Sequence, residues 1–388
     1  MKVIPYGRQD VTREDIEAVI AVLRSDYLTQ GPVVPQFEKA VSEYCGVDNA
    51  IAVNSATSGL HIACLALGLG PGDMLWTTPV TFVASANCAL YCGAGVDFVD
   101  IDPATFNMCV VALEEKLVHA EREGKLPKIV VPVHLCGQSC DMAEIHRLAE
   151  TYGFKVIEDA SHAIGGRYRG RPVGTCEFSD ATVFSFHPVK IITTGEGGMV
   201  LTKHADLAAR MALLRSHGIT RDPQSMSKAP DGPWYYEQIA LGFNYRMTDI
   251  QAALGLSQLS RVDAYVTQRN TLAARYSELL EGVDVVSQRC HEQVYSSFHL
   301  YVVRVRETAA GRGHKRVFEE LRRNDIGVNL HYIPVHLQPY YARRGHSRGD
   351  FPNAEQYYKE AITLPLYPTL SSEQQEQVAA TLVSVLRQ

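Results

Sequence analysis

Between residues 50 and 202, short apolar runs alternate with segments of helical periodicity. The runs typical of strands are Ala50–Val53, Met74–Thr77, Val96–Asp100, Ile129–His134, Lys155–Asp159, Ala181–Phe186 and Met199–Thr202. Helical patterns near residues 57–68, 80–91, 141–152 and 205–215 lie between most of them. Strands that alternate with helices form βαβ crossovers, in which helices cover both faces of the sheet. The alternation therefore predicts an α/β fold with a mostly parallel central sheet.

The remainder of the chain predicts an arm and a second domain. We expect residues 1–14 to form an N-terminal arm near the active site, residues 15–255 a large domain, and residues 256–388 a smaller α+β domain. After residue 256 come long amphipathic helices, a strand over Phe298–Val305, and helices over 314–324, 354–362 and 372–387. A terminal unit of about 130 residues has the usual size of a domain. The polar, proline-containing segment from residue 221 predicts a long loop.

Composition excludes several classes of partner. The chain has 37 basic and 43 acidic residues and a net charge of -6, whereas nucleic-acid binding calls for a basic surface. Its apolar runs are far shorter than the ~20 residues of a membrane span, so we expect no membrane partner. The chain has nine cysteines, an odd number, and its first residues do not resemble a secretory signal peptide. We therefore expect reduced thiols and a cytoplasmic protein. Cys136 and Cys140 have the wrong spacing for a zinc knuckle, and we expect no metal.

Lys190 lies just after an apolar run and before a glycine-rich turn. Burial lowers the pKa of a lysine, and a neutral amine can attack an aldehyde. A lysine after a strand is also a common solvated surface group, so this signal alone assigns no role.

Asp159 ends the apolar run that begins at Lys155. Open α/β sheets bind ligands at the carboxyl ends of their strands. A buried carboxylate needs a cationic partner, and a protonated pyridine nitrogen is one candidate. The alternative is an aspartate that caps the next helix or pairs with an arginine.

Residues 54–59, with the sequence NSATSG, follow the first strand and open a helix. Backbone N–H groups at a helix N-terminus, with small hydroxyl side chains beside them, make a site for a phosphate. The alternative is an ordinary N-cap. Together, a phosphate site, an acid at a strand end and a lysine beyond it suit pyridoxal 5′-phosphate, whose ring is an electron sink when its nitrogen is protonated.

The motifs SATSGL, EDASH, FSFHPVK and TTGEGG, followed by GFNYRMTDIQAALGLSQL, resemble the DegT/StrS-type nucleotide-sugar aminotransferases. The resemblance runs from about residue 3 to the C-terminus. It implies the fold type I architecture, with pyridoxal phosphate bound in the large domain. It also implies two catalytic residues: Lys190 would hold the cofactor covalently and move the proton, and Asp159 would pair with the ring nitrogen.

The same resemblance implies further cofactor contacts. Phe82 would stack on the ring, and His162 would lie near O3′ and the ring face. Ser185 and the backbone of Ala56 and Thr57 would bind the phosphate. Asn244 would reach the phosphate of the neighbouring subunit, which implies a homodimer with shared active sites.

More narrowly, FSFHPVK, ITTGEGG, DGPWYYEQ and HYIPVHLQPYY resemble the branch of this family that serves pseudaminic acid biosynthesis. That branch transfers the amino group of L-glutamate to C4 of UDP-2-acetamido-2,6-dideoxy-β-L-arabino-hex-4-ulose. Its sugar-nucleotide site would be lined here by Tyr6, Tyr27, Leu28, Thr29, Gln30, Asn329, Leu330, His331 and Tyr332. Two alternatives remain open: another nucleotide-linked 4-keto-6-deoxy sugar, and a non-catalytic regulatory protein of the same fold. The roles of His336 and of the 221–238 loop are also open.

Overall fold

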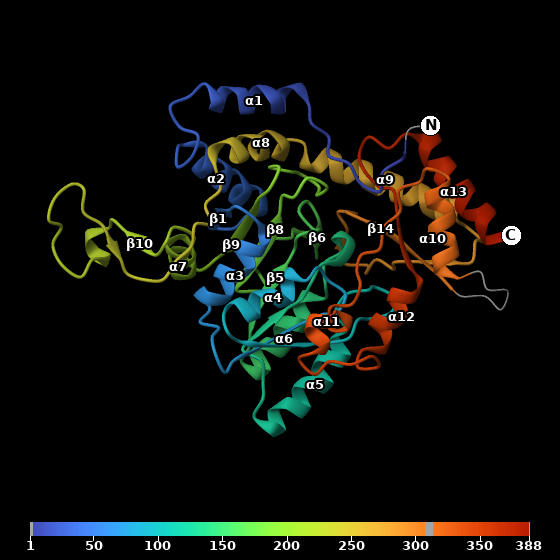
Figure 1. Cartoon of the computed structure of the whole chain (residues 1–388), viewed down its shortest axis with the longest axis horizontal. Coiled ribbons are helices and arrows are strands. Elements are labelled where there is room, and N and C mark those ends of the chain that lie inside the picture. Colours follow the sequence, from blue (N-terminus) through green and yellow to red (C-terminus); the bar gives the residue numbers. More distant parts are fainter. Residues whose placement is uncertain (1–2, 307–312, 388) are drawn as a thin grey trace.

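A seven-stranded sheet forms the centre of the computed structural model, which describes residues 3–306 and 313–387 (Figure 1). Its strand order is β1-β9-β8-β5-β4-β2-β3. The strands are β1 (Asn49–Val53), β2 (Met74–Thr77), β3 (Gly95–Phe98), β4 (Ile129–Val131), β5 (Lys155–Asp159), β8 (Ala181–Ser185) and β9 (Gly198–Thr202). Strand β9 runs antiparallel to both of its neighbours, and the other pairs are parallel. The predicted mostly parallel sheet is confirmed.

Helices cover both faces of this sheet. Successive buried residues of one strand belong to different apolar clusters: Ile51 and Val53 of β1 lie in one, and Ala52 lies in the other. The first cluster includes α3 (Ala56–Ala66), α4 (Ala84–Tyr91) and α7 (Ala205–Arg215). The second includes α2 (Val33–Cys45), α8 (Asp249–Leu259) and α9 (Val262–Leu279). Helices α5 (Val110–Glu123) and α6 (Met142–Tyr152) pack in a further cluster with Trp76 and Val156 of the sheet.

Helix α1 (Arg13–Leu23) is fastened to α8 and α9 through a buried carboxylate. Thr12 and Asp15 form a capping box at its start. The carboxylate of Asp15 also accepts hydrogen bonds from Ser257, Gln258 and Arg261. These bonds hold α1 across α8, at the top of the view in Figure 1.

The C-terminal part has its own three-stranded sheet of β12 (Val285–Ser287), β14 (Tyr301–Val305) and β15 (Ala361–Leu364). Helices α10 (His314–Arg323), α12 (Pro352–Glu360) and α13 (Ser372–Arg387) accompany it, whereas α11 (Pro339–Ala342) packs on the central sheet through Tyr341. Ile4, from the N-terminal arm, belongs to the apolar core of this part. The backbone N–H of Ile4 donates to Asp325, and the N–H of Gly327 donates to the Ile4 carbonyl at 2.7 Å. Ile4 therefore ties the arm to the C-terminal core.

The segment predicted as a long loop projects from the body of the molecule beyond α7 (Figure 1). The short strands β10 (Ile219–Thr220) and β11 (Glu237–Gln238) pair at its base, and a 3₁₀ turn (Pro223–Ser225) lies between them. Another small sheet joins β13 (Val294–Tyr295), β6 (Arg167–Tyr168) and β7 (Arg171–Pro172). Within residues 3–306 and 313–387, no helix is long and apolar enough to cross a membrane.

Candidate active site

A cavity of about 830 Å³ opens at the edge of the central sheet where β1, β5 and β8 have their carboxyl ends. The N-terminus of α3, the segment before α4 and the segment 329–332 complete its wall. Most of the residues expected at the site meet here: Tyr6, Ala56, Thr57, Phe82, Asp159, His162, Ser185, Lys190, Asn329, Leu330, His331 and Tyr332. The cavity thus gathers residues from both the large and the C-terminal parts of the chain.

The first turn of α3 faces this cavity. Ser55 caps the helix by accepting the N–H of Ser58, which leaves the earlier N–H groups of the turn for a ligand. Gly198, the first residue of β9, packs directly against this turn. A Cβ at that position would lie 2.6 Å from the Ala56 nitrogen. The absence of a side chain therefore lets β9 pass close behind a cup of backbone donors suited to a phosphate.

Lys190 is partly buried and lines the cavity, a few residues after β8. Burial lowers its pKa from 10.5 to about 8, and the negative charge of Asp159 acts in the opposite direction. Among the described residues that line the cavity, Lys190 is the single lysine or arginine. Its amine is therefore neutral far more often than that of a surface lysine, as a nucleophile or base requires.

Asp159 ends β5 and is 5% exposed. Its Oδ2 atom accepts a hydrogen bond from the Ser85 hydroxyl at 2.5 Å, and its Oδ1 atom accepts the N–H of Ser161 at 3.1 Å. Glu158, the preceding residue, points to the other side of the strand and bonds with His134. The alternation of a strand thus sends one carboxylate to the cavity and its neighbour to the core.

His162 has a defined tautomer. The backbone N–H of Cys136 donates to its Nδ1 atom at 3.3 Å, and burial holds its pKa well below the usual range. A neutral ring that accepts at Nδ1 carries its proton on Nε2. That proton is donated to the Tyr332 hydroxyl, 3.2 Å away. Since burial also raises the pKa of Tyr332, its hydroxyl keeps a proton of its own to donate.

Two buried histidines of the cavity wall, His299 and His331, are also neutral. Burial lowers the pKa of His331 to about 3 and that of His299 well below the usual range, and the nearby charge of Lys190 acts in the same direction. His331 bonds with Thr363 through Nδ1, at 2.8 Å. The imidazoles therefore add hydrogen-bonding groups to the wall without adding positive charge.

Five of the expected site residues lie outside this cavity. The segment Tyr27, Leu28, Thr29 and Gln30 lies beside the start of α8, where Thr29 bridges Thr248. Tyr27 and Leu28 are 56% and 48% exposed. The backbone carbonyl of Asn244 accepts a hydrogen bond from Asn54 of the same chain at 3.3 Å, next to the phosphate cup. One chain by itself does not bring the Asn244 side chain into its own cavity.

Sequence reasoning missed several residues of the site. His299 lies just before β14, 4% exposed, with its ring centre 4.4 Å from that of His162. Thr81 and Ser85 flank Phe82 and connect to Asp159. The hydroxyls at positions 81 and 85 were visible around the predicted stacking residue, but their link to residue 159 depends on the tertiary fold. His336 is buried, bonds with Glu355 and does not line the cavity.

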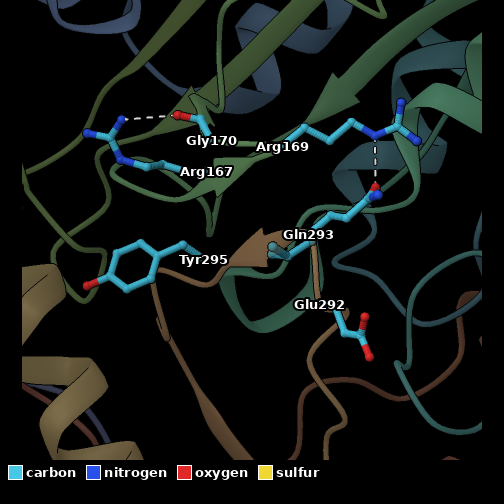
Figure 2. A pocket seen from close by; sticks show the side chains of 7 residues that line it. Arg167, Arg169, Gly170, Glu292, Gln293 and Tyr295 are labelled. Atoms are coloured by element: carbon cyan, nitrogen blue, oxygen red, sulfur yellow. Dashed lines mark hydrogen bonds between the residues drawn. The ribbon is translucent and has the colours of Figure 1, made fainter.

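A second, shallower hollow of about 390 Å³ lies on the small sheet of β6, β7 and β13 (Figure 2). Arg167 reaches the carbonyl of Gly170, and Arg169 reaches the side chain of Gln293 at 2.8 Å. Figure 2 shows the two guanidinium groups extending in different directions. They do not converge on one point, as an anion site would require.

Known proteins resemble this chain over nearly its whole length. It is 37% identical to the UDP-4-amino-4,6-dideoxy-N-acetyl-beta-L-altrosamine transaminase of Campylobacter jejuni, over 99% of this chain and 97% of the relative. Its structure matches Helicobacter pylori PseC, an aminotransferase involved in pseudaminic acid biosynthesis, with a TM-score of 0.90, 30% identity and full coverage of both chains. It also matches Spr1654 of Streptococcus pneumoniae in a pyridoxal-phosphate form, with a TM-score of 0.88, 29% identity and 99% coverage of each chain.

The family model of these enzymes matches residues 9–383. The fold type I architecture expected from the motifs agrees with that of the matched structures. Both the sequence and the geometry thus support one conclusion: the chain is an enzyme that belongs to the DegT/DnrJ/EryC1/StrS aminotransferase family.

Proposed function

We propose that this enzyme uses pyridoxal 5′-phosphate to move the amino group of L-glutamate to C4 of UDP-2-acetamido-2,6-dideoxy-β-L-arabino-hex-4-ulose, as in pseudaminic acid biosynthesis. The observation that carries the proposal is the convergence of Lys190, Asp159 and the α3 N-terminus on one cavity. The choice of sugar rests on the two pseudaminic-type matches and on Asn329–Tyr332 in the cavity wall.

The residues of the cavity fit pyridoxal phosphate. The first turn of α3 and the Ser185 hydroxyl, both in the cavity wall, offer donors to a phosphate. Phe82 is 59% exposed on the rim, which is unusual for a phenylalanine and leaves its face for an aromatic ring. Asp159 supplies a carboxylate for a protonated ring nitrogen, and Lys190 supplies a neutral amine for an aldehyde.

When bound, pyridoxal phosphate withdraws electrons from the carbon that carries the amino group. The chain's own residues move the protons. Lys190 would move a proton from Cα of glutamate to the cofactor carbon that receives the amino group in the first half reaction, and from that carbon to C4 of the sugar in the second. Asp159 keeps the ring nitrogen protonated throughout. The Tyr332 hydroxyl, oriented by His162, donates to an oxygen of the substrate.

A homodimer with shared sites is part of the proposal. Ile16, Ile20 and Leu23 of α1 are 52%, 37% and 54% exposed. In the projecting segment, Trp234 and Leu241 are 73% and 80% exposed. Exposed apolar surface of this extent marks interaction sites. We assign it to a second copy of the chain, in which Tyr27–Gln30 and Asn244 would complete the partner's cavity.

The predicted arm (1–14), large cofactor-binding domain (15–255) and small domain (256–388) remain our division of the chain. Tyr6 in the cavity wall supports the position of the arm. All nine cysteines are free thiols in the structure. This agrees with a reducing compartment, so we place the enzyme in the cytoplasm.

The test combines a colour change with product analysis. Purified protein loaded with pyridoxal phosphate should be yellow and should bleach with L-glutamate but not with D-glutamate. The bleached enzyme is then given a panel of UDP-, TDP- and GDP-linked 4-keto sugars, and products are identified by mass and NMR. Amination of the UDP-β-L-arabino sugar supports the proposal. Amination of a different sugar alone would replace that substrate, and failure to bleach would contradict the assignment of glutamate as donor.

A further inference from the structure

The hydroxyls of Thr81 and Ser85 and the carboxylate of Asp159 form a buried hydrogen-bonded series, of which Thr81 and Asp159 also line the cavity. The Thr81 Oγ1 atom lies 2.7 Å from the Ser85 Oγ atom, which lies 2.5 Å from Oδ2 of Asp159. Thr81, Ser85 and Asp159 are 2%, 0% and 5% exposed. Bulk water therefore does not compete for these bonds.

The direction of each hydrogen bond among Thr81, Ser85 and Asp159 follows from which of these groups can donate. An ionised carboxylate can only accept hydrogen bonds, so the single hydroxyl hydrogen of Ser85 goes to Asp159. The Phe82 carbonyl is a poorer alternative acceptor, at 3.4 Å. Thr81 therefore donates to Ser85, and Ser85 donates to Asp159.

Both oxygens of the Asp159 carboxylate are held. Ser85 bonds to Oδ2, and the backbone N–H of Ser161 bonds to Oδ1 at 3.1 Å. Rotation of the carboxylate would break both bonds. The plane of the group is thus fixed while its remaining lone pairs face the cavity that it lines.

Thr81 and Ser85 belong to the same short segment of the chain as Phe82. Thr81 and Ser85 flank this aromatic residue, and Ser85 lies in the first turn of α4. One short stretch of chain therefore sets two things: the place of the aromatic side chain on the rim and the angle of the carboxylate on β5.

We propose that Ser85, oriented by Thr81, is a positioning residue that holds the Asp159 carboxylate at the angle from which it pairs with the ring nitrogen of pyridoxal phosphate. This inference rests on the proposed function. It assigns to Ser85 no contact with substrate or cofactor, because its hydroxyl is engaged with Asp159.

The experiment measures the protonation of the ring nitrogen directly. Holoenzyme is prepared with ¹⁵N-labelled pyridoxal phosphate, and the nitrogen chemical shift is recorded across pH for wild type, Ser85→Ala, Asp159→Asn and the double variant. The rate of bleaching by L-glutamate is measured in parallel. Ser85→Ala should lower the pH at which the nitrogen loses its proton and slow bleaching by about 10- to 100-fold, the effect of one hydrogen bond to a charged group.

The matched control is Thr77→Val. Thr77 is also fully buried, and its hydroxyl donates to the Val131 carbonyl on the sheet, outside the cavity. It should lose stability without changing the nitrogen signal. If Ser85→Ala does not fold, Thr81→Val removes the outer donor and should shift the nitrogen signal in the same direction by a smaller amount.

The double variant tests whether Ser85 acts through Asp159, and the single variant Asp159→Asn tests whether Asp159 acts on the ring nitrogen. If Ser85 acts through Asp159, Ser85→Ala adds nothing in the Asp159→Asn background. Full additivity, or a nitrogen signal in Ser85→Ala and Thr81→Val no different from Thr77→Val, would overturn the positioning role alone. A wild-type nitrogen signal in Asp159→Asn would overturn the role of Asp159 in the proposed function, and this inference with it.

Discussion

Lys190 shows how a single side chain acquires its chemistry from where the fold places it. In water its amine would be protonated almost completely at neutral pH. Burial in the cavity lowers its pKa to about 8, so that about a tenth of the molecules carry a free amine at pH 7. The sequence alone left open a solvated surface lysine at this position, and the role of Lys190 was expected only from the family resemblance. The sequence could not predict that the charge of Asp159 would limit the shift.

The pH dependence of cofactor capture tests this shift. We expect the rate at which the cofactor-free enzyme captures pyridoxal phosphate, followed by visible absorbance, to rise with pH. The midpoint should lie near 8, because the lowered pKa frees the amine there rather than near 10.5. Lys190→Ala should still bind the cofactor without covalent capture and should lose at least about 10²–10⁴ in turnover. A midpoint near 10.5 would contradict the burial argument.

Tyr332→Phe tests the orientation inferred from the His162 tautomer. The change removes a hydroxyl that accepts from His162 and is free to donate to substrate. We expect kcat/KM for the keto sugar to fall by about tenfold, while the midpoint of cofactor capture by Lys190 stays in place. Tyr341→Phe is the control, because its buried hydroxyl bonds to Asn87 and does not line the cavity. Equal losses in both variants would argue against a substrate contact.

At the scale of secondary structure, the sequence predicted where several strands lie but not how all of them pair. Strands β2 and β5 have the bounds predicted from sequence, because their apolar runs end abruptly at polar or turn residues. The antiparallel direction of β9 and the pairing of β15 with β14 were not predictable, since local pattern does not specify strand partners. Helix α12 ends at residue 360, so residues 361–362, predicted as the end of this helix, instead begin β15. Helix α5 was omitted although Leu113 and Leu117 repeat at helical spacing.

Gly198→Ala tests the contact between β9 and α3. An added Cβ would meet backbone atoms of Ser55 and Ala56 within 3 Å, so one of the two elements must shift. We expect a loss of about 1–3 kcal/mol in the free energy of unfolding, and weaker binding of both pyridoxal phosphate and inorganic phosphate. Gly70→Ala is the control because its Cβ would meet nothing within 4 Å. Unchanged phosphate affinity in Gly198→Ala would contradict the expectation that close packing of β9 against the first turn of α3 is needed for phosphate binding.

At the scale of the whole molecule, the expected site residues fall into two groups: those that line the cavity of one chain and those that lie outside it. The sequence predicted twelve residues that now line one cavity, including Tyr6 and His331 from distant parts of the chain. It did so through resemblance, because distance along the chain hides which segments meet. Asn244 and Tyr27–Gln30 remain predictions, since a single chain holds them apart from its own cavity.

Subunit complementation tests the shared site. Lys190→Ala and Asn244→Ala chains are each expected to be impaired, and mixing them under conditions that exchange subunits should restore activity. One site of the heterodimer would then combine Lys190 of one chain with Asn244 of the partner subunit, while the other site carries both defects. Activity at saturating cofactor is compared with that of either parent alone. If heterodimers form and activity stays at the level of the parents, Asn244 serves its own subunit.

The N-terminal arm connects two parts of the molecule within three residues. Ile4 is buried in the C-terminal core, and Tyr6 forms part of the cavity wall, with its carbonyl bonded to the N–H of Leu366. Trimming by a contaminating protease at this point would remove a piece of core and a piece of wall together, while every residue assigned to chemistry survived. A preparation that lost activity on storage could thus look intact on a gel. Intact mass measurement should accompany each assay, and purification tags belong at the other end of the chain.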